Sequence, residues 1–325
     1  MSWMRNSNCA SGKDRAPRRR VAATACLALL LGGCATPQYA IRPTPVPDES
    51  PAAVELERTI SAYQARDLER HGAQSVPLGE RRWGFDVQDT VNRLSRVTER
   101  PTLHYQVVLL SDREPNAVAL ADGRIYITAG MLNYLASRGS HPNELALIVS
   151  HELAHTVAQH LVKRYQQLQQ QQILMAIVGL GTSIATQQAG VPSSVGSLVS
   201  DVASLVNNVV ASGYSQAQEL EADQLGVRYM LRAGYQPRAA LPMLRDFSRF
   251  DVPWPFLRTH PYSQRRADDL ERYLQETGTT ASPPRSTPAT IEAQRRWLHD
   301  AQQLYPVGSQ SWNNLEQQLK ALGDE

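Results

Sequence analysis

The residues best suited to chemistry are two histidines and a glutamate in the stretch His151-Glu152-Leu153-Ala154-His155. On a helix, side chains four positions apart lie one above the other, so both imidazoles can reach one metal ion. Zinc with three protein ligands and one open position lowers the pKa of a bound water to about 7 and makes it a nucleophile. Glu152 would then act as the general base. The motif predicts hydrolytic chemistry and a third ligand elsewhere.

The residues before this motif favour a metal site over a chance match on a polar helix. Residues 143–150 are largely apolar and predict a buried helix, with Pro142 in its first turn. Two histidines and a glutamate buried there would be costly without partners, and one metal ion would satisfy all three. We expect the helix to continue through His160 towards Gln172, which turns His160 away from the metal face.

A second pair of acidic residues can complete the site. Glu219 and Asp223 are four positions apart on a predicted helix that opens near Tyr214 and runs to Gly234, so they share one face. A zinc site needs a third ligand, and also a carboxylate that accepts the ring proton of a ligating histidine. The alternative is an acidic helix face exposed to solvent.

Upstream of the motif the hydrophobic period changes from helical to two. Apolar residues alternate over 103–109, and the runs 116–120 and 124–128 flank Asp122-Gly123, a hairpin signal. A short helix is expected over 129–137. Together with helical patterns earlier in the chain, this predicts a mainly helical α+β fold with a small antiparallel sheet.

The chain from about residue 116 to residue 266 resembles a known family of zinc metallopeptidases that includes the CAAX prenyl endopeptidases, HtpX and BepA. Three motifs carry the resemblance in a consistent order. Asn116-Ala117 with 123–127 is similar to the family's edge strand and hairpin, 151–155 to its metal motif, and 219–223 to its Glu-x-x-x-Asp motif. Gln216 and Gln224 depart from the family pattern, in which arginine and a basic residue are common.

The resemblance implies a zincin-like catalytic domain and roles for individual residues. Zinc would be held by His151, His155 and Glu219. Asp223 would support a ligating histidine, while Glu221 would be structural or lie at the surface. Since no membrane span is expected, the chain is most similar to the soluble, lipid-anchored branch of the family.

A histidine-proline loop followed by arginine is another feature of this resemblance, found here at Thr259-His260-Pro261 and at Arg266. Three roles are open for His260: a fourth zinc ligand, a hydrogen-bond donor to the oxyanion, or a loop cap. With Glu152 it is a catalytic candidate. Arg266 fits the family's arginine better than Arg265, and a helix-end salt bridge is its alternative.

The amino terminus has the pattern of a lipoprotein signal peptide over residues 1–33. Basic residues precede the apolar run 21–31, which meets Gly32-Gly33-Cys34. The stretch resembles a lipobox, which implies that Cys34 is lipidated, and Ala35 after it favours the outer membrane. The alternative is an ordinary signal peptide. All three cysteines lie at or before the cut, so disulfides play no part in the mature domain.

Composition divides the rest of the chain. A proline-rich tether (34–51) precedes a peptidase domain (52–276), a linker (277–290) and a C-terminal helical segment (291–325) that is expected to pack back on the domain. The apolar segment 173–210 could be a core helix, a lid, or a surface for lipid or a client protein. Beyond residue 33 there are 27 basic and 30 acidic residues, which argues against a nucleic-acid partner.

These observations predict a periplasmic zinc endopeptidase with one Zn²⁺ per chain, held by its lipid in the inner leaflet of the outer membrane. Its substrates would be unfolded or misassembled envelope proteins, bound as an added strand beside residues 116–120. One alternative is a chaperone-like outer-membrane assembly lipoprotein with a latent zinc site and the assembly machinery as partner. Another is a purely structural zinc lipoprotein, but such a site has no use for Glu152.

Overall fold

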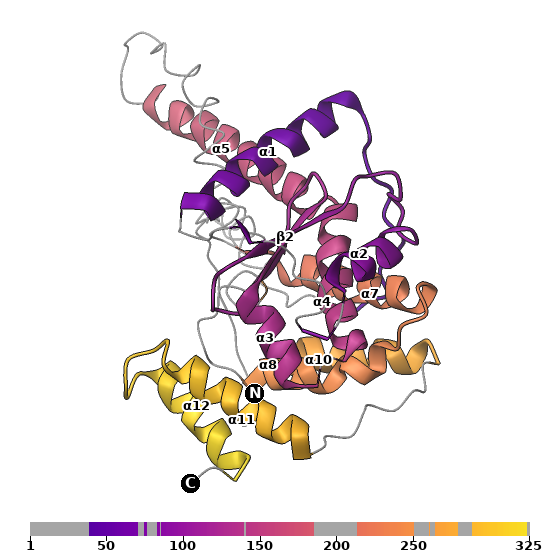
Figure 1. Ribbon diagram of the computed structural model, residues 1–325. Coiled ribbons are helices and arrows are strands. Elements are labelled where there is room, and N and C mark those ends of the chain that lie inside the picture. The colour runs from indigo at the N-terminus through magenta and orange to yellow at the C-terminus, as the bar shows by residue number, and fades with distance from the viewer. Residues whose placement is uncertain are drawn as a thin grey trace, which may run out of the picture. The chain divides into compact units, whose positions relative to one another are not determined.

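The computed structural model describes residues 39–70, 75–76, 83–84, 86–139, 141–184, 213–249, 260, 264–278 and 288–323. The predicted signal peptide, Cys34 and most of the apolar segment 173–210 lie outside these residues. All the helices and strands belong to one compact unit that begins at Ile41 (Figure 1).

Helices make up most of the described chain and confirm the mainly helical α+β class. The predicted helices over 52–71 and 129–137 are present with bounds shifted by at most one residue, and the one over 86–98 is shorter. In chain order the helices are α1 (Pro51–Arg70), α2 (Val87–Ser95), α3 (Ala129–Ser137), α4 (Pro142–Val157), α5 (His160–Ile184), α7 (Gln216–Arg232), the 3-10 helix η2 (Pro237–Ala240), α8 (Leu241–Arg249), α10 (Gln264–Glu276), α11 (Pro288–Gln302) and α12 (Gln310–Ala321).

The sheet has four strands in the order β1-β2-β4-β3. The strands are β1 (Ser75–Val76), β2 (Gln106–Leu110), β3 (Ala117–Ala119) and β4 (Arg124–Thr128). The predicted hairpin is confirmed, because β3 pairs antiparallel with β4 around Gly123, whose φ is +94°. The expectation of a wholly antiparallel sheet is wrong, because β2 and β4 are parallel. The chain reverses between β2 and β3 and again between β3 and β4. Because β4 lies between β2 and β3, it therefore pairs parallel with β2.

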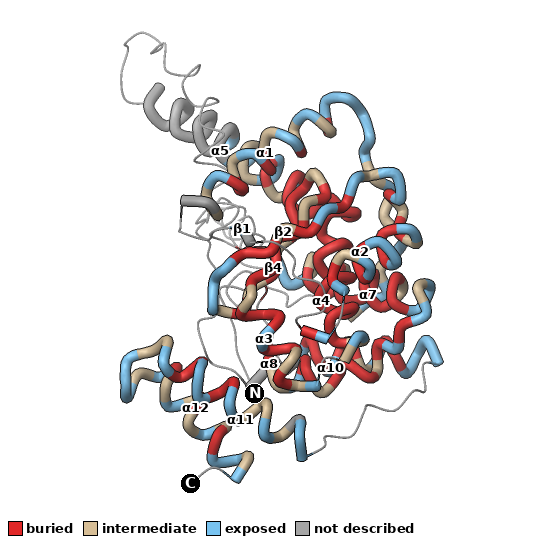
Figure 2. Tube along the Cα trace, viewed as in Figure 1, coloured by how far each residue is buried: buried red, intermediate tan, exposed pale blue. Residues whose placement is uncertain are grey.

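Helix α4 is the buried centre of the fold, and α7 packs along it. Every residue of α4 from Glu144 to Val157 is buried, and Figure 2 shows the red of α4 and α7 where they lie together. Gly226 on α7 allows the close approach. A Cβ atom there would lie 3.0 Å from Ser150 Oγ and 3.2 Å from the backbone nitrogen of His151. Ser150, next to the predicted zinc ligand His151, therefore packs directly against the backbone of α7 at Gly226.

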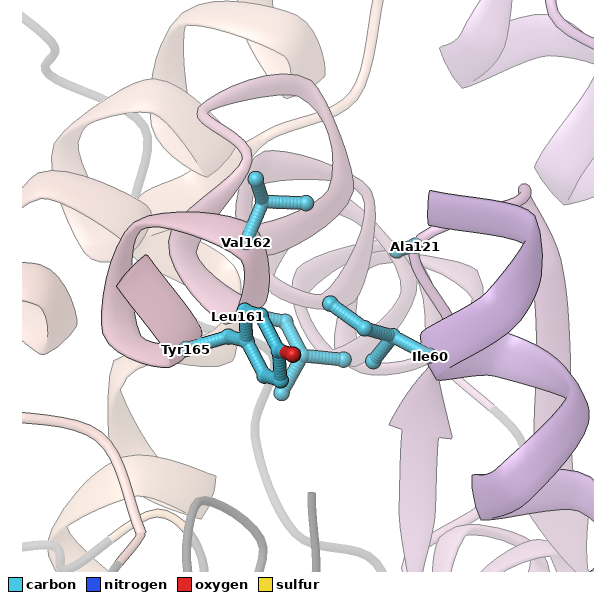
Figure 3. Packing of buried hydrophobic residues seen from close by; sticks show 5 residues of the cluster. All are labelled: Ile60, Ala121, Leu161, Val162 and Tyr165. Atoms are coloured by element: carbon cyan, nitrogen blue, oxygen red, sulfur yellow. The ribbon is translucent and has the colours of Figure 1, made fainter. Parts of the chain in front are cut away.

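Helix α4 ends at Val157, so the prediction of one helix running on to Gln172 is wrong. Gln159 has φ of 54°, a left-handed conformation that interrupts the α-helix, and α5 begins at His160 in a new direction. The start of α5 is fixed by a hydrophobic cluster. Figure 3 shows its members, Ile60 of α1, Ala121 of the hairpin, and three residues of α5, namely Leu161, Val162 and Tyr165.

The segment before α1 is extended and lies on the domain over part of the predicted tether. The Arg42 N–H donates to the side-chain oxygen of Gln224 on α7 (2.7 Å). The backbone of Asp48 forms two bonds with the side chain of Gln159, one through its N–H and one through its carbonyl, both at 2.8 Å. Side-chain amides thus bind this segment through its backbone.

The C-terminal hairpin packs against the domain, as expected. Trp297 of α11 is 8% exposed and meets the ring of Tyr134 on α3 edge-on, with the ring centroids 4.9 Å apart. Tyr134 also stacks on Phe247 of α8, at 5.3 Å. Among the helices in the described parts of the chain, none is both long enough and apolar enough to cross a bilayer.

Candidate metal centre

Four buried side chains converge where α4 meets α7. They are His151 and His155 of α4, Glu219 of α7, and His260, which precedes α10. One ligand atom from each lies within 4.8 Å of all the others. The structure thus brings the three predicted zinc ligands together and adds His260 to them.

The spacing of these atoms fits a zinc ion. Zinc–nitrogen bonds of 2.0–2.1 Å in a tetrahedron place neighbouring ligand atoms about 3.3 Å apart. His151 Nε2 lies 3.0 Å from His155 Nε2 and 3.3 Å from His260 Nδ1. Glu219 oxygens lie 3.4, 3.5 and 3.2 Å from the same atoms of His151, His155 and His260. The donors are borderline-soft nitrogens with one carboxylate, the set that zinc prefers.

Asp223 orients the first ligand. One turn after Glu219, its Oδ1 lies 3.0 Å from Nδ1 of His151. Asp223 can accept a hydrogen bond from the Nδ1–H of neutral His151, which leaves the Nε2 lone pair directed into the cluster. This is the arrangement that the spacing of the two acidic residues predicted.

Arg266 joins the two carboxylates of α7. Its guanidinium donates to both oxygens of Asp223, through Nε at 2.9 Å and Nη2 at 2.7 Å, and its Nη1 lies 2.5 Å from Oε2 of Glu219. The side chain is 7% exposed. Arg265 beside it is 44% exposed and lies 3.8 Å from Asp269. Of the two, Arg266 belongs to the centre.

Neighbouring charges set the protonation states of the cluster. Burial disfavours charge on His151, but its bonds to Asp223 and Glu219 outweigh burial and raise the pKa of His151 to about 9. Burial and the nearby His151 charge hold the pKa of His155 well below its ordinary value. Burial opposes ionisation of Glu219, yet Arg266 and the histidines hold its pKa well below the ordinary range. Without a metal, His151 is therefore the charged imidazolium, with a proton on both ring nitrogens, at neutral pH.

Glu152 is held beside the cluster by the sheet. Its Oε2 accepts the N–H of Ala119 in β3 at 2.9 Å, and its Oε1 lies 3.5 Å from Nε2 of His260. Burial raises the pKa of the Glu152 carboxyl, although His260 and His151 act in the opposite direction. One oxygen is thus fixed by the backbone while the other is directed at the centre.

The sequence did not reveal the contacts around His155 or the turn that follows it. The Tyr214 ring stacks on the His155 ring at a centroid distance of 3.8 Å. His160 is not in the ligand cluster, as predicted, but it does contact His155, and Glu221 contacts His160. The break after α4 depends on Gln159, whose left-handed conformation no sequence signal reveals.

The fold and the centre define a metallopeptidase of the His-Glu-x-x-His type with a downstream glutamate. The model of peptidase family M48 matches residues 85–274, and the chain belongs to this family. Peptidases of family M48 depend on zinc, so the chain is a zinc metallopeptidase. The family predicted from the motifs is confirmed.

Two relatives illustrate the range of the family. The mitochondrial metalloendopeptidase OMA1 of Saccharomyces cerevisiae is 23% identical over 276 residues, which cover 76% of this chain and 73% of the yeast protein. The beta-barrel assembly-enhancing protease of Escherichia coli is 26% identical over 172 residues, or 51% of this chain and 33% of that protein. The chain thus matches only one third of the bacterial relative.

The adjacent arginines provide a matched test of the centre. Arg266→Met leaves two carboxylates buried without their cation, which should lower the free energy of unfolding by about 3–5 kcal/mol in metal-free protein. Zinc should restore part of the loss because it supplies positive charge. Arg265→Met should change stability by less than about 0.5 kcal/mol. Urea denaturation with and without zinc measures both, and equal effects of the two substitutions would contradict the assignment.

Zinc affinity should rise with pH up to about 9. Because the pKa of His151 is raised to about 9, zinc must displace a proton from its ring at lower pH. Affinity should therefore increase about tenfold per pH unit between pH 7 and 8.5 and level off above 9. Chelator competition at several pH values measures this, after correction for the chelator's own protonation. An affinity that does not vary with pH would show that His151 is already neutral in the metal-free protein over this pH range.

Proposed function

We propose that this metallopeptidase is an endopeptidase that binds one zinc ion per chain and cuts unfolded or misassembled envelope proteins. The observation that carries the proposal is the convergence of His151, His155 and Glu219 beside Glu152, with the edge strand β3 bonded to that same glutamate. The residues for metal binding, proton transfer and peptide binding thus lie next to one another.

The chemistry divides between the metal and Glu152. When bound, zinc acts as a Lewis acid that polarises the substrate carbonyl and lowers the pKa of water. Glu152 takes a proton from the attacking water and delivers it to the leaving amine. In the metal-free site, burial raises the pKa of the Glu152 carboxyl above that of an exposed glutamate. The bond from Ala119 N–H keeps its other oxygen in place during the transfer.

The register of β3 supports binding of substrate as an added strand. Thr128 N–H donates to Asn116 C=O, and Leu120 N–H donates to Arg124 C=O. The alternate residues Ala117 and Ala119 therefore direct their backbone groups away from β4. Among the described strands β3 is at the edge of the sheet, and on that side the Ala119 N–H is already bonded to Glu152 while the Ala119 C=O and the Ala117 groups make no bond to β4. An extended peptide can pair there through its backbone, whatever its side chains. Such tolerance suits unfolded substrates.

His260 lies at the fourth corner of the cluster. Its Nδ1 is 3.2 Å from Glu219 Oε1 and its side chain is fully buried. This position supports the role of a fourth ligand that closes the centre in a resting state, over that of a loop cap. The latent site of the chaperone-like alternative would share this geometry, so activity must distinguish the two.

The cellular location we propose is the periplasm, with a lipid on Cys34 in the inner leaflet of the outer membrane. The sequence pattern of residues 1–34 supports it. The name of the bacterial relative, a beta-barrel assembly-enhancing protease, supports envelope proteins and their assembly machinery as partners.

Substitution of the base tests the endopeptidase function. Purified wild type and Glu152→Gln should each bind one zinc ion, but only wild type should cut casein, because glutamine cannot take the proton of water. We expect a loss of at least about 100-fold in cleavage rate. Equal cleavage by both proteins would reject the proposal. Zinc in both proteins without cleavage in either would favour a latent enzyme or a chaperone.

His260→Ala, made alongside, separates the roles of this residue. A higher cleavage rate than wild type would show that His260 closes the centre at rest. A lower rate with zinc retained would show that it stabilises the oxyanion, and an unchanged rate would leave it a structural role.

Two cysteines test the anchor. Wild type expressed in a Gram-negative cell should incorporate labelled palmitate, and Cys34→Ser should not, because the thiol that carries the lipid is gone. Cys26→Ser, in the apolar run of the signal, is the matched control and should still be labelled. Labelling of Cys34→Ser would contradict the lipoprotein assignment.

A further inference from the structure

His155 has a partner on the side of its ring that faces away from the metal centre. Its Nε2 lies in the ligand cluster, while its Nδ1 is 2.9 Å from Nδ1 of His160. The other nitrogen of His160 lies 3.3 Å from Oε2 of Glu221 on α7. His160 is 1% exposed, and the Glu221 side chain is 22% exposed. The three side chains form a continuous chain from the centre to the surface.

While His155 binds metal, only one placement of protons allows hydrogen bonds both between His155 and His160 and between His160 and Glu221. Ligation through Nε2 requires that the proton of neutral His155 be on Nδ1, from which it is donated to Nδ1 of His160. His160 then carries its own proton on Nε2 and donates it to Glu221. The carboxylate of Glu221 thus acts on a metal ligand through an intervening imidazole.

The backbone is shaped to bring His160 to this position. In a continuous helix a residue five positions after His155 would lie about 140° around the axis from it. The left-handed Gln159, with φ of 54°, redirects the chain. This conformation is unfavourable for a residue with a side chain, and it persists only where the surroundings enforce it. The Gln159 amide does so by bonding to Glu57 Oε1 and to the backbone of Asp48, each at 2.8 Å.

Both sides of the turn are held by further contacts. The side chain of Gln218 on α7 donates to the carbonyl of His160 at 3.2 Å. Next to His160, Leu161 and Val162 pack in the hydrophobic cluster with Ile60 of α1 (Figure 3). The His160 ring therefore has a fixed place that does not depend on its bond to His155.

We propose that His160 and Glu221 are positioning residues of the metal centre. They fix the tautomer and ring orientation of His155 and increase the basicity of its Nε2, as Asp223 does directly for His151. Partners behind metal-ligating histidines commonly contribute 10–100-fold to metal affinity. The proposal rests on the zinc site of the proposed function but concerns binding of the metal, so it can be tested apart from peptide cleavage. The competing explanation is that His160 only fills space in the core.

The test measures zinc affinity of the full chain by chelator competition at fixed pH. His160→Phe has a ring of similar size but cannot accept a hydrogen bond from His155 or donate one to Glu221, and it should weaken zinc binding by about 10–100-fold. His160→Gln can accept from His155 through its oxygen and donate to Glu221 through its nitrogen, so it should recover most of the affinity. Glu221→Gln should give a smaller loss, because the charge is removed but a hydrogen bond remains.

Leu161→Ala is the control for stability. It opens the hydrophobic cluster at the same turn without touching the chain of side chains, so it should lower the free energy of unfolding while zinc affinity stays at the wild-type value. Wild-type affinity in folded His160→Phe would overturn the proposal, as would a loss in Leu161→Ala equal to that in His160→Phe. If His160→Phe does not fold, unchanged affinity in Glu221→Gln overturns it.

The proposed function fails separately. If wild type binds zinc and cuts casein while His160→Phe binds zinc equally well, only the positioning role is rejected. If wild type binds no zinc, the zinc-dependent function is rejected and the positioning role with it.

Discussion

The structure depends on the burial of ionisable side chains between α4 and α7. Removing charged groups from water costs several kcal/mol for each ion unless partners replace the water. Glu219 and Asp223 are buried with Arg266, and the histidines face these carboxylates. Each group is acceptable only because of the others, so the helices that carry them must meet in one register. The bare surface of Gly226 against Ser150 sets that register.

Much of this centre could be predicted because its parts are local. Ligands four residues apart on one helix, and a carboxylate pair four apart on another, follow from helical geometry alone. The hairpin followed from alternation around Asp122-Gly123, and its bounds agree closely with β3 and β4. What motifs supplied was the expectation that the two helices meet.

The unpredicted features depend on contacts between residues distant in sequence. The parallel pairing of β2 with β4 arises from insertion of the hairpin, which periodicity within a strand does not reveal. The break at Gln159 has no glycine or proline to mark it, because Glu57 and Asp48 hold the turn from more than one hundred residues away. For that reason the contact of His160 with His155 could not be predicted, although its place outside the ligand cluster was.

The docked segment before α1 bears on where the folding unit begins. Gln224 is fully buried beside Asp223, and its side-chain oxygen is satisfied by the Arg42 N–H. A chain that began at residue 51 would lack the Arg42 N–H that binds this oxygen. It would also lack the backbone groups of Asp48 that bind the side chain of Gln159. Each hydrogen bond lost typically lowers the stability of a fold by about 0.5–1.5 kcal/mol. Residues 41–50, proline-rich and distant from every catalytic motif, therefore belong to the cooperative unit that assembles the metal centre.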